Sequence, residues 1–65
     1  MIKISIIIPA FNEEATIIPL LKSVHEEVVK IYDISFEIIV IDDCSIDNTN
    51  MFLKQNQTLY NHLIS

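Results

Sequence analysis

The stretch Lys3-Ile-Ser-Ile-Ile-Ile-Pro9 decides how this chain of 65 residues folds. It is β-branched, almost continuously apolar and ended by proline, which is typical of a strand buried on both faces of a sheet. A second run of the same kind is Phe36-Glu-Ile-Ile-Val-Ile-Asp42. We therefore expect adjacent parallel strands over about 3–9 and 36–42, in which the most buried side chains are Ile4, Ile6, Ile8, Ile39 and Ile41.

The segment between these two runs has the spacing of a helix. Its apolar residues fall on one stripe, formed by Ile17, Leu20, Leu21, Val24, Val28 and Ile31. Pro19 is tolerated only in the first turn, so the helix is expected over about 16–32 with Thr16 as its cap. A second helix is expected over about 47–56, and His62-Leu-Ile-Ser65 has the character of a beginning third strand.

Strand, helix, strand and helix in this order predict an α/β fold with a right-handed crossover between parallel strands. We treat residues 1–65 as one unit, either a small domain or a piece of a larger one. A composition of 51% hydrophobic and 20% charged residues excludes a disordered chain.

Charge and composition exclude several functions. A net charge of −5, with nine acidic residues against four lysines, excludes a nucleic-acid partner, which would need clustered basic residues. The absence of glycine excludes the Walker A loop and the dinucleotide-binding glycine turn. The longest apolar stretch, Ile6–Phe11, is far short of the roughly 18 residues of a membrane span. We expect a cytoplasmic protein with a reduced thiol at Cys44.

Acidic residues gather where the two expected strands end. Five of the nine fall in or beside the segments Ala10–Ala15 and Asp43–Asp47, namely Glu13, Glu14, Asp42, Asp43 and Asp47. Both segments lie at the carboxyl edge of the sheet, which is where open α/β sheets bind ligands. There Asp42 can accept a hydrogen bond from a base, and Asp43 can bind ribose hydroxyls or Mg²⁺. The alternative is that one aspartate caps a turn and the other is solvated.

Phe11 also lies at this edge. An aromatic ring in that place can stack on a nucleotide base, or it can cover the top of the core.

Two motifs together resemble the start of the family-2 glycosyltransferases. The first is Ile4-Ser-Ile-Ile-Ile-Pro-Ala-Phe-Asn-Glu-Glu14, and about two dozen residues later comes Glu37-Ile-Ile-Val-Ile-Asp-Asp-Cys-Ser-Ile-Asp-Asn-Thr49. The resemblance covers Ile2 to about Leu53 and looks closest to the polyprenyl-phosphate sugar transferases of the dolichol-phosphate mannose synthase type.

The resemblance implies the beginning of a GT-A, Rossmann-like domain that binds a nucleotide-diphosphate sugar, truncated near the third strand. By this resemblance, Pro9, Ala10 and Phe11 line the base and ribose pocket, Glu13 approaches the ribose, Asp42 the base, and Asp43 to Ser45 the nucleoside. The parent enzyme, at the cytoplasmic face of a membrane, would transfer the sugar with a divalent cation, Mg²⁺ or Mn²⁺. This chain is expected to hold no metal, to supply no catalytic residue and to be inactive alone.

Two departures from the family pattern bear on the site. Cys44 and Asn48 stand where the family usually has glycine. Asparagine tolerates a positive φ, whereas cysteine does not do so readily.

Two other functions fit the residues. One is a receiver-like module that binds Mg²⁺ through the acidic pair, and the other is a non-catalytic remnant that packs on a partner. Unpaired sheet edges also favour self-association.

Overall fold

The computed structural model describes residues 2–65 and is an α/β fold with one parallel sheet. The elements follow in the order β1 (Ile2–Ala10), α1 (Ile17–Val28), β2 (Ile34–Asp42), α2 (Thr49–Gln55), the 3-10 helix η1 (Gln57–Leu59) and β3 (His62–Ile64). The sheet has the strand order β1-β2-β3, and both pairs are parallel. The predicted α/β class and the parallel pairing of the first two strands are confirmed.

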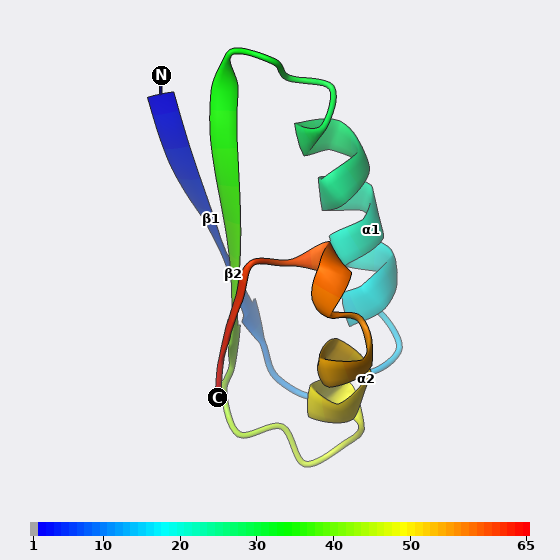
Figure 1. Ribbon diagram of the computed structural model, residues 1–65. Coiled ribbons are helices and arrows are strands. Elements are labelled where there is room, and N and C mark those ends of the chain that lie inside the picture. Colours follow the sequence, from blue (N-terminus) through cyan, green and yellow to red (C-terminus); the bar gives the residue numbers. More distant parts are fainter. Residues whose placement is uncertain (1) are drawn as a thin grey trace.

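Both helices cover the same face of the sheet, and β1 lies at the edge away from them (Figure 1). In β1 and β2 the even-numbered residues face the helices, so Ile8, Ile38 and Val40 are buried. Odd-numbered residues face the other side, where Ile7 is 53% exposed. We call this uncovered side the open face.

The expectation that both faces of the strands are buried is therefore wrong for the described residues. Of the five isoleucines expected to be most buried, only Ile8 is. Ile39 and Ile41 are half-buried because they lie on the open face. Ile4 faces the helix side but is 40% exposed, since it lies in the first half of β1, whereas the buried residues of this strand, Ile8 and Ala10, lie in the second half.

The core lies between the sheet and the two helices. Ile17 and Leu21 of α1 and Leu53 of α2 are at most 1% exposed and pack against the buried side chains of β1 and β2. The predicted stripe of α1 therefore supplies core residues, but Leu20 at its margin is 47% exposed.

Helix α1 ends at Val28, not near residue 32 as predicted. The amides of Lys30 and Ile31 donate to the carbonyls of Glu27 and Val28, which are three residues back. Such bonds tighten the last turn and end the α-helical pattern. The β-branched residues here also disfavour continuation.

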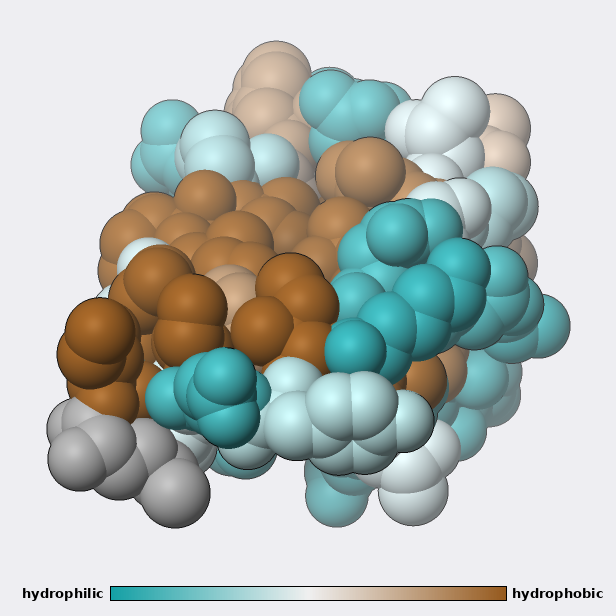
Figure 2. All heavy atoms as spheres, turned by 90° about the horizontal axis from the view of Figure 1, so that it is seen from above, coloured by the Kyte–Doolittle hydropathy of each residue, from teal (hydrophilic) through white to brown (hydrophobic). Residues whose placement is uncertain are grey.

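The end of the molecule at which β1 and β2 begin keeps much apolar surface. Figure 2 shows this end, where hydrophobic residues form one continuous area with hydrophilic residues beside it. Large apolar side chains that remain exposed among the residues of this end are Ile2, Ile4, Val29, Ile31 and Tyr32.

No helix within residues 2–65 has the length and hydropathy needed to cross a membrane.

Candidate functional site

Two loops leave the carboxyl edge of the sheet side by side. The last paired residues of β1 and β2 are Ala10 and Asp42, and the Asp43 amide donates to the Ala10 carbonyl at 2.9 Å. We call residues 11–16 the first loop and residues 43–48 the second loop. The predicted meeting of the two segments at one edge is thus what the structure shows (Figure 1).

Hydrogen bonds fasten the two loops together and to the start of α2. The Asn12 amide donates to Ser45 Oγ at 3.0 Å, and the Ile46 amide donates to Asn12 Oδ1 at 2.8 Å. The Glu13 amide donates to Thr49 Oγ1 at 2.8 Å. These bonds join residues more than thirty positions apart, so they fix the shape of the edge without any ligand.

Asp42 is a buried carboxylate whose oxygens are already used by the protein. It is 4% exposed; its Oδ1 accepts from the Ser45 amide and hydroxyl, and its Oδ2 accepts from Asn50 Nδ2 at 2.9 Å. Burial by itself would raise the pKa of Asp42, but the hydrogen bonds from Ser45 and Asn50 outweigh it and the pKa lies below the usual 3.8. Asp42 is therefore an ionised support for the second loop.

Asp47 plays a similar part at the start of α2. Its Oδ1 accepts from the Thr49 amide at 3.0 Å and from the Thr49 hydroxyl, and its Oδ2 accepts from the Glu14 amide at 3.3 Å. Desolvation raises the pKa of Asp47, and the bonds from Thr49 more than offset this, so the pKa is lowered. The carboxylate thus joins both loops to α2.

Phe11, Glu13 and Asp43 are among the groups that face solvent at this edge, together with Glu14, Cys44 and Ile46. Phe11 is 56% exposed, and the carboxylates of Glu13 and Asp43 are exposed as well. Phe11 and Asp43 directly follow the paired residues Ala10 and Asp42, so the backbone leaves the sheet side by side at these two residues. An exposed ring beside an exposed carboxylate is an arrangement that can stack on a planar ligand and accept its hydrogen bonds.

The other predicted site residues have different surroundings. Ala10 is 1% exposed and belongs to the core beneath the loops, and Ser45 is half-buried between Asn12 and Asp42. Pro9 is exposed, but strand alternation places it on the open face with Ile7. The structure thus gathers Phe11, Glu13, Asp43 and Ser45 at one edge, with Asp42 and Ala10 below them.

Two residues in the loops have positive φ. They are Asn12, with a φ of 51°, and Cys44, with a φ of 55°. Asn48 has a φ of −84°, so the asparagine that replaces the family's glycine at this position does not have to adopt a left-handed conformation. Cys44, by contrast, occupies the left-handed region that favours glycine.

Sequence reasoning missed three residues that hold the site together. They are Asn12, Thr49 and Asn50, each of which makes a side-chain hydrogen bond at this edge. Asn12 carried a signal, because an asparagine in a loop after a strand is a common left-handed residue. The partners of Thr49 and Asn50 depend on how α2 meets the loops, which the sequence does not show.

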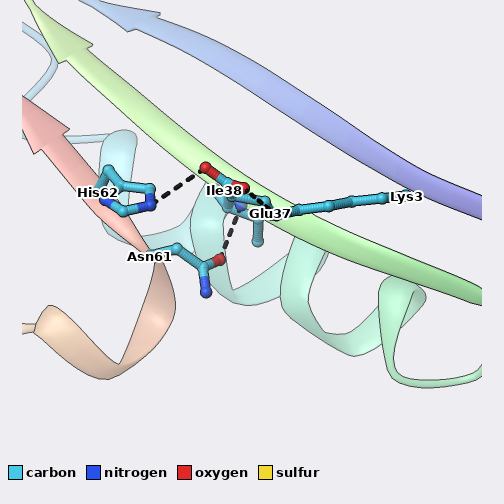
Figure 3. Close-up of polar contacts among 5 residues, drawn as sticks. All are labelled: Lys3, Glu37, Ile38, Asn61 and His62. Carbon is cyan, nitrogen blue, oxygen red and sulfur yellow. Dashed lines mark hydrogen bonds and ion pairs between the residues drawn. The ribbon is translucent and has the colours of Figure 1, made fainter.

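A second polar cluster lies on the open face, away from the loops. Glu37 of β2 accepts from Lys3 Nζ of β1 at 3.0 Å and from His62 Nε2 of β3 at 3.1 Å (Figure 3). The hydrogen bond from Lys3 is the main cause that lowers the pKa of Glu37. His62 had no evident partner in the sequence, and the structure supplies one through strand pairing.

Two cavities, of about 190 and 460 Å³, lie away from the carboxyl edge, and the larger is lined by residues between Lys54 and Ser65. The smaller is the more enclosed. It lies between α1, β2 and the segment 58–61, and its lining includes Val28, Phe36, Leu59 and Tyr60. The Tyr60 hydroxyl donates to the Leu53 carbonyl at 2.7 Å and is thus engaged within the protein. The candidate site is therefore an exposed surface formed by two loops, and a ligand there would be only partly enclosed.

Within residues 2–65, no three side chains of His, Cys, Asp or Glu are grouped so that they could hold a metal ion. Asp42 and Asp47 already accept hydrogen bonds from the chain itself, so we derive no step through a metal here.

Parallel strands with crossover helices and two loops at the carboxyl edge define an open α/β fold, in which ligands bind at that edge. The family model described as "Glycosyl transferase family 2" matches residues 5–64. This chain belongs to glycosyltransferase family 2, and its fold agrees with the Rossmann-like start of a GT-A domain.

Curated relatives agree with the family. The chain is 38% identical over 61 residues to an uncharacterised glycosyltransferase of Mycoplasma genitalium, covering 94% of this chain and 20% of that protein. It is 34% identical over 65 residues to a poly(ribitol-phosphate) beta-N-acetylglucosaminyltransferase of Staphylococcus aureus, covering all of this chain and 11% of that protein. The chain thus spans a fifth or less of these relatives. No solved structure matches it with significance.

Proposed function

We propose that this chain provides the nucleoside-binding surface of a glycosyltransferase that takes its sugar from a nucleotide-diphosphate sugar. The observation that carries the proposal is the pair of exposed groups, Phe11 and Asp43, on two loops that are fastened together at the carboxyl edge. Membership of the family supports sugar transfer in general, and the carboxyl edge is where open α/β sheets bind ligands.

The exposed groups suit the two chemical features of a nucleoside. The Phe11 ring can stack on the face of the base, since every base has a π-face. The Asp43 carboxylate can accept hydrogen bonds from an imide N–H of the base or from ribose hydroxyls, and the exposed Glu13 carboxylate can accept from the ribose.

Asp42 has a supporting part in this proposal. The family resemblance assigns the base to Asp42, but the oxygens of that carboxylate accept from Ser45 and Asn50. Burial also leaves a base little access to this carboxylate, since Asp42 is 4% exposed. Asp43 is exposed next to it and takes the direct contact instead.

The transfer step itself needs groups beyond this surface. The developing charge on the diphosphate requires a divalent cation, Mg²⁺ or Mn²⁺, and the acceptor hydroxyl requires a base. In this proposal both belong to other parts of a longer enzyme, and residues 2–65 supply recognition of the nucleoside.

A receiver-like magnesium module is disfavoured by the same geometry. Such a module needs a free acidic pair, but Asp42 is buried and already accepts hydrogen bonds from Ser45 and Asn50.

Titration with uridine diphosphate and guanosine diphosphate, followed by amide and aromatic chemical shifts, tests the proposal. Without a phosphate clamp, we expect a dissociation constant on the order of 1 mM, equivalent to about −4 kcal/mol. The first shifts should be those of Phe11, Asp43 and their neighbours. Phe11→Ala and Asp43→Asn should each weaken binding severalfold.

His25→Gln is the control, because His25 is exposed on α1, away from the two loops. Shifts centred on α1 or β3, or binding unchanged in both loop variants, would rule out the assigned surface.

A further inference from the structure

Asn12 connects the two loops through both its backbone and its side chain. Its amide donates to Ser45 Oγ at 3.0 Å, and its side-chain Oδ1 accepts from the Ile46 amide at 2.8 Å. The two partners are neighbours in the second loop, so Asn12 binds that loop at two adjacent points.

The left-handed backbone makes this double contact possible. Asn12 has a φ of 51°, a conformation that asparagine adopts more readily than most other residues. The chain thereby reverses direction just after Phe11, and the next amide, that of Glu13, reaches Thr49 Oγ1 at 2.8 Å. Three consecutive residues of the first loop are thus placed by one turn.

We propose that Asn12 is a positioning residue for the nucleoside-binding surface: it fastens the first loop to the second and so holds Phe11 beside Asp43 before a ligand arrives. This inference rests on the proposed function. Asn12 itself contacts no ligand in this proposal, since its amide and its Oδ1 are used within the protein. Its effect on binding is indirect. Because the loop is already ordered in the free protein, no part of the binding free energy is spent on ordering it.

Three substitutions separate the two contributions of Asn12. Asn12→Gly keeps the left-handed backbone and the amide bond to Ser45, but removes the Oδ1 acceptor. Asn12→Ala also disfavours the left-handed backbone, so both bonds are weakened. Asn12→Asp keeps a side-chain oxygen at the same place and still tolerates a positive φ.

We expect the dissociation constant for uridine to rise about threefold in Asn12→Gly and about tenfold in Asn12→Ala, with Asn12→Asp close to the original chain. Uridine is the main probe because it carries no phosphate that the added charge of Asn12→Asp would repel. In the free protein, the Ile46 amide should exchange faster in Asn12→Gly and Asn12→Ala, and Asn12→Asp should restore its protection.

Glu14→Gln is the matched control in the same loop. Its side chain is exposed, and only its backbone amide, which the substitution keeps, donates to the second loop, at Asp47 Oδ2. The control should leave uridine binding and Ile46 exchange unchanged.

The outcomes separate this inference from the proposed function. Binding by the original chain together with unchanged affinity in Asn12→Gly and Asn12→Ala overturns only the role of Asn12. Failure of the original chain to bind uridine or uridine diphosphate overturns the proposed function, and the role of Asn12 with it.

Discussion

Cys44 occupies a backbone conformation that costs free energy for any residue with a β-carbon. Its φ is 55°, and a left-handed conformation costs about 1–2 kcal/mol for most residues other than glycine. Glycine loses more backbone entropy on folding than cysteine does, which offsets part of the stabilisation gained when the strain at this position is removed. We therefore expect Cys44→Gly to raise the free energy of unfolding by about 0.5–1 kcal/mol in a denaturant titration.

Asn48→Gly is the matched control for Cys44→Gly. Both positions carry glycine in the family pattern, but the φ of Asn48 is −84°, so glycine relieves no strain there. We expect this variant to lower the stability by a few tenths of a kcal/mol. Equal stabilisation by both variants would contradict the assignment of strain to Cys44.

Asp42 should make the stability of the fold depend on pH in the acidic range. Its pKa is lowered in the folded state, so its contribution is complete above the usual pKa of 3.8 and is lost as the pH falls through the folded value. Asp42→Asn should therefore cost about 1–3 kcal/mol at pH 7 and give a flatter decline in stability below pH 4.

Unfolding measured by circular dichroism at pH 7, 5 and 3 tests the role of Asp42. Asp33→Asn is a suitable control, because Asp33 is an exposed carboxylate in the connection between α1 and β2. The interpretation fails if the two variants show the same dependence on pH.

The gathering of Phe11, Asp42 and Asp43 at one edge was predictable from the order of the elements alone. Which of the two aspartates is buried was not. A shift of one residue in strand register exchanges the faces of all side chains, and the continuous isoleucine run conceals the period of two that would fix it.

At the level of elements, the connections explain why only one face of the sheet is covered. Each helix follows its strand and leads to the next strand on the same side, in the order β1-β2-β3. Right-handed crossovers that progress in one direction place both helices on one face. The sequence predicted the parallel strands, but its apolar strand composition suggested cover on both faces, which two helices on one side do not provide.

Strand β3 has only three residues and depends on Asn61 for its attachment. The Asn61 amide donates to the Ile38 carbonyl at 2.8 Å. Asn61 Oδ1 accepts from the Ile38 amide, also at 2.8 Å (Figure 3). This side chain acts in place of a strand carbonyl and extends the pairing beyond the residues of β3. Asn61→Ala should therefore cost about 1 kcal/mol and make the Ile38 amide exchange about fivefold faster.

His62→Gln is the comparison for Asn61→Ala. It removes the ion pair with Glu37, but the His62 side chain is 61% exposed, and an exposed pair contributes little. Hydrogen exchange of the Ile38 amide should hardly change in this variant. A larger effect of His62→Gln than of Asn61→Ala would show that the ion pair, not Asn61, holds β3.

At the level of the whole molecule, the net charge opposes self-association of the chain, whereas the exposed apolar surface favours it. The net charge of −5 makes copies of the chain repel one another. The open face carries Ile7 and Ile64, which are 53% and 55% exposed. Strand β1, of nine residues, pairs with β2 on one side, and no strand among residues 2–65 pairs with its outer side. Salt screens the charge repulsion between copies of the chain, so at high ionic strength the attraction between their apolar surfaces should outweigh it.

We expect the 65-residue chain to self-associate through β1 and the open face, since long apolar edge strands pair readily with further strands. Sedimentation should show a mass that rises with protein concentration, and more so at 0.5 M salt. Ile7→Lys should suppress the association, because it places a charge in the middle of β1 on the open face. Ser23→Lys changes the net charge by the same amount on the exposed side of α1, so it separates the effect of charge from that of the surface. A monomer at all concentrations, or equal suppression by both variants, would show that the sheet edge is not the contact.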